Sequence, residues 1–321
     1  MIFRLLGLDL DGTLLGPDGR VAAPTVAALR EAARRGVRVA LVTGRSAGSA
    51  GHHAGLLARR IGHPVAYAAC NGAGIYGPSG EPLRLRPIPR GLLAEALEAL
   101  RGLGLLVSVY GREHVFVQEP WRHVRAFWLP RRPPPWRWPA ALLATLRFGL
   151  QNRVRWVGDI RDMAREGAEP ALKLFVTTPG GAPAEGGGAL AGPIRGWGFG
   201  TPVLPGRAGA RLLEAAVRVL ARLAPALHVT RSGADNIEVT APGVHKGWAL
   251  EALAAMYGIR REEVLAIGDG PNDVEMLEFA GMGVAMGNAP PEVQARADRV
   301  APPVWEHGAA AALRRYVLGE G

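Results

Sequence analysis

The feature that most limits how this chain can fold is a set of short apolar runs that each end abruptly at a polar residue. Each run is typical of a buried strand, and the amphipathic pattern at 24–35, which stops at Gly36, predicts a helix between the first two. Alternating strands and helices predict a parallel sheet, whose strands have their carboxyl ends at one edge. We therefore expect these polar ends to lie together: Asp9 and Asp11 after 2–8, Thr43 after 37–42, Asn71 after 65–69 and Asp269 after 264–267.

The end of the chain repeats this alternation, whereas the middle has a different pattern. The end predicts helices at 246–257, 271–280 and 309–317 and strands at 264–267 and 282–286. The middle predicts strands at 105–110, 114–118, 172–177, 228–230 and 236–240, with helices at 91–101 and 209–223. We therefore predict an α/β protein in which residues 1–82 and 242–321 form a parallel-sheet core and residues 83–241 form an inserted α/β module.

The bulk composition is that of an ordinary globular protein, with 48% hydrophobic and 21% charged residues. No apolar run approaches the ~18 residues of a membrane span, and we expect no signal peptide before Asp9. The single cysteine, Cys70, excludes an intramolecular disulfide and a cysteine-based zinc site, and it fits a cytoplasmic location. The net charge of +10 raises a nucleic-acid partner, but all 38 basic residues except Lys173 and Lys246 are arginines. This bias indicates that the positive charge reflects a general preference for arginine and not a nucleic-acid-binding function, so we expect no nucleic-acid partner. A homo-oligomer is left as an open alternative.

Two carboxylates after the first strand suit covalent phosphate chemistry. Asp9 and Asp11 are two positions apart, so an extended chain points both side chains to one side, and Gly12 then permits a sharp turn. One carboxylate can attack phosphorus, and its neighbour can protonate the leaving oxygen and later accept a proton from water. For this motif alone, a plain Asp-Gly turn is the alternative.

Asp269 and Asp273 flank residues 270–272 and offer hard oxygen ligands of the kind that Mg²⁺ prefers. Such an ion would neutralise phosphate charge. The alternative is helix capping, because an Asp at a helix start satisfies free backbone N–H groups, and Asp273 could do both.

Thr43 and Lys246 are candidates for holding the phosphate. The hydroxyl of Thr43 and the amides around Gly44 could bind a phosphate oxygen, although a plain turn threonine is the alternative. Lys246 opens a predicted helix, where a cation is disfavoured by the helix dipole unless an anion lies near. A compact ammonium there suits a bridge between Asp9 and the phosphate.

Together these motifs resemble the haloacid dehalogenase-like hydrolase superfamily, and their spelling is nearest to its Cof-type phosphatases. The four motifs occur in the expected order as 9–14 (DLDGTL), Thr43-Gly44-Arg45, Lys246 and 268–273 (GDGPND). Two further matches support the Cof-type branch, namely 71–73 (NGA) and 236–239 (NIEV) leading into 242–247 (PGVHKG).

The resemblance implies a Rossmann-like core, a mobile cap over 83–241 and a Mg²⁺-dependent phosphatase. Asp9 would be the nucleophile and a metal ligand, and Asp11 the general acid/base with its main-chain carbonyl on the metal. The other implied ligands are Asp269 and Asp273 for the metal, and Thr43, Gly44, Arg45, Asn71, Lys246 and Asn272 for the phosphate or substrate. A small phosphorylated metabolite would be the substrate. Sugar phosphates are preferred, nucleotides, flavin mononucleotide or pyridoxal phosphate are alternatives, and a non-catalytic anion-binding or nucleic-acid-binding protein is the other class.

The spacing places the cap after Asn71, because 11–43 is too short for a folded insertion and 71–246 is long. An excess of chain at about 119–170 departs from the resemblance. It holds five of the eight tryptophans, interleaved with arginines. We favour a loop packed on the cap, ahead of a subunit contact or a specificity element, with nucleic-acid binding last.

Overall fold

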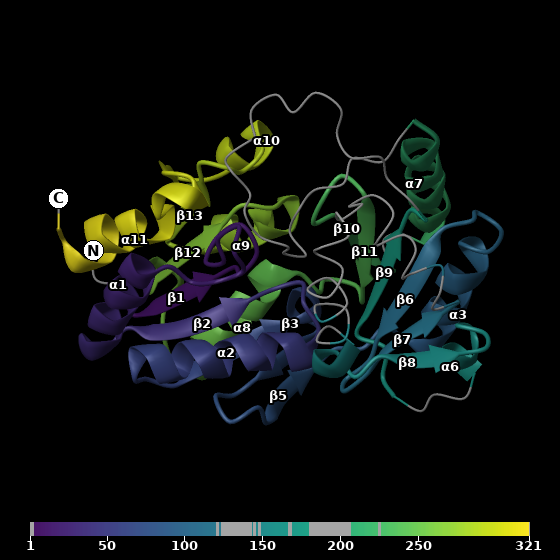
Figure 1. Cartoon of the computed structure of the whole chain (residues 1–321), viewed down its shortest axis with the longest axis horizontal. Coiled ribbons are helices and arrows are strands. Elements are labelled where there is room, and N and C mark those ends of the chain that lie inside the picture. The colour runs from purple at the N-terminus through teal and green to yellow at the C-terminus, as the bar shows by residue number, and fades with distance from the viewer. Residues whose placement is uncertain are drawn as a thin grey trace.

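The computed structural model describes residues 3–119, 122, 143, 146, 149–165, 169–179, 207–223 and 226–320. These residues form two β-sheets side by side, as Figure 1 shows, with both chain termini beside the larger sheet at the left. The larger sheet has eight strands in the order β14-β13-β12-β1-β2-β3-β4-β5. The smaller has six in the order β10-β11-β9-β6-β7-β8. The predicted α/β class, with a parallel core sheet and a second, inserted sheet, is confirmed.

The larger sheet, which we call the core sheet, is parallel from β14 to β3 and then antiparallel through β4 and β5. Its strands are β1 (Leu5–Leu8), β2 (Arg38–Val42), β3 (Val65–Ala69), β4 (Gly74–Tyr76), β5 (Pro82–Leu85), β12 (Val264–Gly268), β13 (Met282–Met286) and β14 (Arg299–Ala301). The predicted boundary of the core at residue 82 falls inside β5, and the domain limits stay a prediction.

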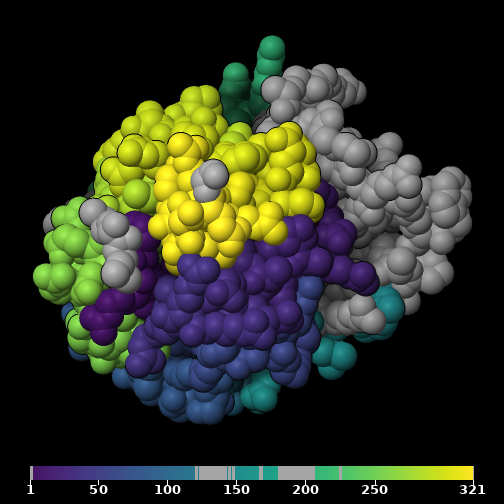
Figure 2. Space-filling model, turned by 90° about the vertical axis from the view of Figure 1, so that its left-hand side faces the viewer, coloured from purple at the N-terminus to yellow at the C-terminus, as the bar shows by residue number. Residues whose placement is uncertain are grey.

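Helices cover both faces of the core sheet, so its strands are apolar on both sides. Leu6 and Leu8 lie in one hydrophobic cluster with α1 (Ala23–Arg34) and α2 (Ala47–Ile61), whereas Leu5 lies in the other with α8 (Lys246–Met256). The other core helices are η1 (Cys70–Gly72), η4 (Arg261–Glu263), η5 (Pro271–Asp273), α9 (Val274–Phe279), α10 (Pro291–Gln294), η6 (Val304–Glu306), α11 (Gly308–Ala312) and η7 (Leu313–Leu318). Seen from the terminal side in Figure 2, the yellow C-terminal segment lies against the purple N-terminal region, because α11 and η7 contact α1.

The smaller sheet, which we call the cap sheet, is antiparallel except for its β7–β8 pair. Its strands are β6 (Leu106–Tyr110), β7 (Val115–Gln118), β8 (Arg155–Val157), β9 (Lys173–Thr177), β10 (His228–Thr230) and β11 (Asn236–Thr240). Helices of this region whose bounds the described residues give are α3 (Arg90–Ala99), α6 (Asp162–Arg165), α7 (Arg207–Leu220) and η3 (Ala221–Leu223). Leu174 and Val176 on β9 belong to the same apolar cluster as Leu93 of α3 and Leu213 of α7, so the alternate residues of β9 point to the opposite face of the sheet.

The predicted strands and helices of the core and the middle are present, with ends shifted by at most three residues. The predicted helices at 209–223, 271–280 and 309–317 each consist of two consecutive helical elements. The sequence did not predict α2, the strand β4, the edge strands β5, β8 and β14, or the short helices α6 and α10. Much of the arginine- and tryptophan-rich excess at 119–170 lies outside the described residues, including Trp121, Trp128, Trp136 and Trp138. Trp156 lies on β8 and is 67% exposed. No helix in the part of the chain described here is both long and apolar enough to cross a membrane.

Candidate active site

The carboxyl ends of four parallel strands bring the predicted polar residues to one edge of the core sheet. Asp9 follows β1, Thr43 follows β2, Asn71 lies in η1 after β3, and Asp269 follows β12. The strands are neighbours in the order β12-β1-β2-β3, so residues far apart in sequence meet there. Most of these side chains are buried, and the following contacts hold them.

Lys246 joins two of the carboxylates. It is the first residue of α8 and only 2% exposed, and its Nζ lies 2.7 Å from Asp9 Oδ1 and 2.7 Å from Asp273 Oδ1. Burial alone would lower its pKa, but the carboxylates of Asp273 and Asp9 raise the pKa above its ordinary value. Lys246 is therefore a fixed ammonium at the helix start, next to the anions that its position predicted.

Asp9, Asp269 and Asp273 form a compact acidic group, each offering one carboxylate oxygen within 4.8 Å of the others. Burial raises the pKa of Asp9 to about 7, with Lys246 opposing and Asp273 adding to the rise. Burial and the neighbouring Asp9 also raise the pKa of Asp269 well above its ordinary value. Buried carboxylate oxygens that repel one another are a donor set that fits a hard divalent cation such as Mg²⁺.

Two side chains that the sequence analysis did not single out fix Asp269. Thr13 Oγ1 donates to Asp269 Oδ1 at 2.9 Å, and Asn288 Nδ2 donates to Asp269 Oδ2 at 3.0 Å. Asn288 Nδ2 also lies 3.0 Å from the carbonyl of Gly12. The signal for Asn288 was available, because it follows β13 at the same edge of the sheet. These donors orient the carboxylate toward the acidic group.

Asp273 has the capping geometry that was its alternative interpretation. Its Oδ2 accepts hydrogen bonds from the backbone N–H groups of Asp269 at 3.0 Å and Gly270 at 2.8 Å, while Oδ1 accepts from Lys246. Asp273 therefore shapes the loop and lies in the acidic group as well. Its coordination of a metal stays a prediction.

Asp11 lies outside the acidic group because Arg45 holds its carboxylate in a fork. Arg45 Nε donates to Asp11 Oδ2 at 2.7 Å and Nη2 donates to Oδ1 at 2.6 Å. Arg45 Nη1 also donates to Ser49 Oγ at 3.2 Å and lies 2.8 Å from His53 Nε2. Burial would raise the pKa of Asp11, but the hydrogen bonds and charge of Arg45 outweigh burial and lower the pKa. In this conformation Arg45 contacts the candidate acid/base, whereas the sequence predicted a phosphate contact.

The remaining predicted phosphate-binding residues lie on three neighbouring loops, which follow β2, β3 and β12 and are joined by hydrogen bonds. The backbone N–H of Arg45 donates to Thr43 Oγ1 at 3.2 Å, and Asn272 Nδ2 donates to Asn71 Oδ1 at 3.2 Å. Asn71 has a φ of 55°, a conformation that asparagine tolerates better than most residues. A Cβ atom on Gly44 would lie 2.9 Å from Asn71 Oδ1, so only glycine fits there without a shift.

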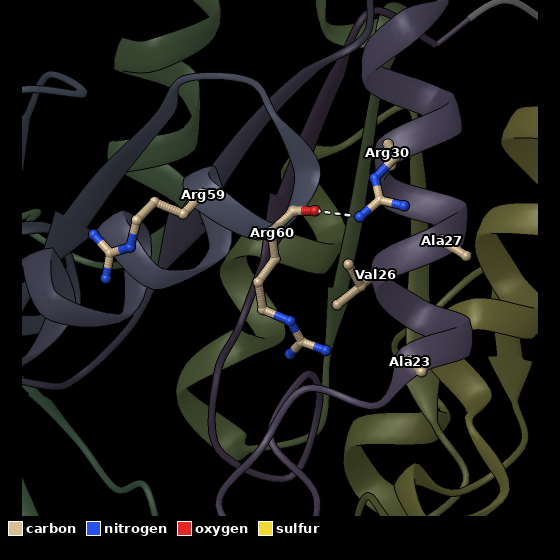
Figure 3. A pocket seen from close by; sticks show the side chains of 6 residues that line it. All are labelled: Ala23, Val26, Ala27, Arg30, Arg59 and Arg60. Carbon is tan, nitrogen blue, oxygen red and sulfur yellow. Dashed lines mark hydrogen bonds between the residues drawn. The ribbon is translucent and has the colours of Figure 1, made fainter.

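A hollow on the outer surface between α1 and α2 is a separate feature of the core. It measures about 350 Å³ and is lined by Ala23, Val26, Ala27, Arg30, Arg59 and Arg60. Arg30 donates to the carbonyl of Arg60 at 2.6 Å, and Arg60 donates to the carbonyl of Val21 at 2.8 Å. In Figure 3 the Arg59 side chain points away from the other two, so these guanidinium groups do not converge on one point.

The fold and site define a class of α/β proteins with a parallel-sheet core, a cap sheet, and a lysine beside a group of three aspartates at the strand ends. A family model described as haloacid dehalogenase-like hydrolase matches residues 6–131 and 210–313. The chain belongs to the haloacid dehalogenase-like hydrolases, in their Cof-type branch, and is a phosphatase.

Relatives and solved structures agree with this assignment. The chain is 29% identical to an HMP-PP phosphatase of Cronobacter sakazakii, over 98% of this chain and 94% of that protein. It is 27% identical to phosphatase YwpJ of Bacillus subtilis, over 98% of this chain and 100% of the relative. A haloacid dehalogenase-like hydrolase structure from B. subtilis superposes with a TM-score of 0.73 at 25% identity, covering 98% of this chain and 100% of that one.

Proposed function

We propose that this protein is a Mg²⁺-dependent phosphatase that hydrolyses a small phosphorylated metabolite through an aspartyl-phosphate on Asp9. The observation that carries the proposal is the ammonium of Lys246 held 2.7 Å from Asp9 Oδ1, beside the group of three carboxylates at the strand ends. A buried carboxylate next to a fixed cation can approach an anionic phosphate. The hydroxyl of Thr13 and the amide of Asn288 hold the neighbouring Asp269 in place.

The proposed reaction has two displacements at phosphorus. The carboxylate of Asp9 attacks, the bond from phosphorus to the leaving oxygen breaks, and that oxygen takes a proton from Asp11. Water then attacks the phosphorus of the aspartyl-phosphate, gives a proton to Asp11 and releases inorganic phosphate, which restores Asp9. Thr43, Gly44, Asn71, Lys246 and Asn272 would hold the phosphate oxygens throughout.

The two hydrogen bonds from Arg45 favour the ionised carboxylate of Asp11 before the substrate binds. A carboxylate with a lowered pKa is ready to accept a proton from water, the second displacement. To donate a proton first, Asp11 must lose part of the fork. We propose that the guanidinium of Arg45 turns toward the bound phosphate, as the sequence predicted for this residue.

Asp9, Asp269 and Asp273, with the main-chain carbonyl of Asp11, would hold the Mg²⁺. When bound, this ion supplies positive charge that neutralises the phosphate and eases the approach of the Asp9 carboxylate. The three-carboxylate donor set supports a hard cation over a soft one.

The substrate class that we propose is a sugar phosphate, on the resemblance of the motifs to Cof-type phosphatases. The relatives widen the set to be tested, because one acts on HMP-PP. Another, a 5-amino-6-(5-phospho-D-ribitylamino)uracil phosphatase of Bacillus subtilis, is 44% identical over 92 residues, or 29% of this chain. Nucleotides, flavin mononucleotide and pyridoxal phosphate complete the set.

The test is release of inorganic phosphate from this panel by the full chain, with Mg²⁺ and with a chelator, beside Asp9→Asn. We expect release that needs both Mg²⁺ and Asp9. Release that persists in Asp9→Asn would contradict the covalent mechanism, and release that persists in chelator would contradict the metal requirement. The compound with the highest kcat/KM identifies the substrate class.

A further inference from the structure

The cap sheet presents a buried ion pair to the core that the proposed chemistry does not use. Lys173 on β9 and Glu238 on β11 lie on neighbouring antiparallel strands, and Lys173 Nζ is 2.9 Å from Glu238 Oε1. Lys173 is 1% exposed and Glu238 is 3% exposed. Both side chains lie on the face of the cap sheet opposite the helices α3 and α7.

Each partner of this pair also makes one contact with the core, and both contacts are at the proposed phosphate site. Lys173 Nζ donates to the carbonyl of Gly44 at 2.5 Å, and Asn71 Nδ2 donates to Glu238 Oε2. Asn71 in turn accepts from Asn272 at 3.2 Å. The pair therefore connects the loop after β2 to the loop after β3 through the cap.

The contact with Gly44 has a directional consequence for the loop. In a trans peptide the carbonyl of one residue and the N–H of the next point to opposite sides. Because Lys173 draws the Gly44 carbonyl toward the cap, the N–H of Arg45 is turned the other way, where it donates to Thr43 Oγ1 at 3.2 Å. The lysine thus fixes which side of this peptide faces the site.

The chemistry at position 173 favours an ammonium over a guanidinium. Arginine supplies all but two of the 38 basic residues of this chain, and both lysines, Lys173 and Lys246, are buried within the site region. Lys173 Nζ serves two acceptors at one point and lies 4.6 Å from the centre of the Tyr110 ring. A planar fork cannot converge on one point in this way. A fully buried pair adds little net stability, so stability alone does not explain it.

We propose that the Lys173–Glu238 pair is a positioning element through which the cap sets the geometry of the phosphate-binding loop. The inference rests on the proposed function, because it takes the loop at Thr43 and Gly44 to be the one that binds phosphate. Lys173 and Glu238 act through Gly44 and Asn71, so their loss misplaces the groups that bind the phosphate.

The variants for the test are Lys173→Met, Lys173→Arg and Glu238→Gln in the full chain, with Asn152→Ala as the matched control. Asn152 Oδ1 accepts a hydrogen bond from Ser46 Oγ across the same junction of cap and core. We measure kcat and KM on the best panel compound, the affinity for inorganic phosphate by calorimetry, and Tm. A misplaced loop costs about 100-fold in kcat.

We expect Lys173→Met and Lys173→Arg to lower kcat by about 100-fold and to weaken the binding of inorganic phosphate. Both effects are expected at an assay temperature well below the Tm of each variant. Asn152→Ala should keep kcat within about threefold of the wild-type value, because losing a contact between cap and core is not by itself expected to displace the phosphate-binding loop. If Lys173→Met does not fold, Glu238→Gln carries the test, because it keeps the side-chain shape and removes the charge that pairs with Lys173 and accepts from Asn71.

Three results would overturn the proposal. In the first, the Lys173 variants match wild type in kcat. In the second, Asn152→Ala loses as much as they do. In the third, Lys173→Arg restores full activity. Wild-type turnover in the same assay keeps the phosphatase proposal standing in each case. A wild-type protein that neither hydrolyses the panel nor binds inorganic phosphate would remove both proposals together.

Discussion

Replacing Asp9 by asparagine should make the metal-free protein more stable while it abolishes turnover. Asp9 lies in a buried group of three carboxylates, and its pKa rises from 3.8 to about 7. Ionising it in the folded protein therefore costs free energy that the unfolded chain does not pay. Asn keeps the shape and the hydrogen-bond acceptor for Lys246 but removes the charge.

The size of the effect follows from this pKa. A rise of about three units corresponds to about 4 kcal/mol once the pH exceeds both values. The opposing effect of Lys246 is already contained in this pKa, and the asparagine still accepts a hydrogen bond from Lys246. The expected net gain is therefore about 4 kcal/mol, or about 6 °C in Tm for a chain of 321 residues.

The pH dependence has a definite sign. A carboxyl whose folded pKa is raised binds its proton more tightly when folded, so its stabilising contribution is complete below about pH 4 and is lost as the pH rises through about 7. Asp9→Asn should therefore exceed wild type in Tm at pH 8 in chelator and lose more than half of that advantage at pH 5. Mg²⁺ should raise the Tm of wild type more than that of the variant.

The assay is thermal unfolding in chelator at pH 5 and pH 8, and again with Mg²⁺ at pH 8. The matched control is Asp162→Asn on α6, which removes a partly exposed carboxylate that lies 3.7 Å from Arg165 and should change Tm little at either pH value. A variant no more stable than wild type at pH 8, or equally favoured at pH 5, would refute the electrostatic reasoning about the acidic group.

Three further outcomes follow from the site. Lys246→Ala should reduce kcat/KM on the best panel compound more than Arg45→Ala does, because Lys246 contacts the nucleophile directly; equal losses would count against its role. Asn288→Ala should weaken Mg²⁺ affinity by about 10- to 100-fold in a calorimetric titration, since Asp269 loses a donor that orients it, and unchanged affinity would contradict that. Burial raises the pKa of Cys70 to about 12, so iodoacetamide should label the unfolded chain at pH 8 and spare the folded protein, and rapid labelling of the folded protein would disprove its burial.

Local sequence patterns predicted most of the fold and most of the residues that meet at the candidate site. Apolar runs that stop at a polar residue predicted strands, and the rule that parallel strands end at one edge placed Asp9, Thr43, Asn71 and Asp269 together. The same rule applied to β13 would have found Asn288. The helix at Ala47–Ile61 was missed because it is rich in Gly and His, although a parallel β2–β3 pair requires a crossover there.

The sequence by itself determined which chemical groups the site could contain, because their types and spacing are encoded along short stretches of chain. Only the tertiary structure decided which groups contact one another. Arg45 donates two hydrogen bonds to the carboxylate of Asp11. Thr13 donates to Asp269, which is 256 positions away in sequence, and Lys173 donates from the cap sheet to the carbonyl of Gly44. Such pairings depend on strand order and on how the two sheets pack, and local propensity carries no information about either. The physical reason is that hydrogen bonds and ion pairs act over a few ångströms in space, whatever the separation in sequence.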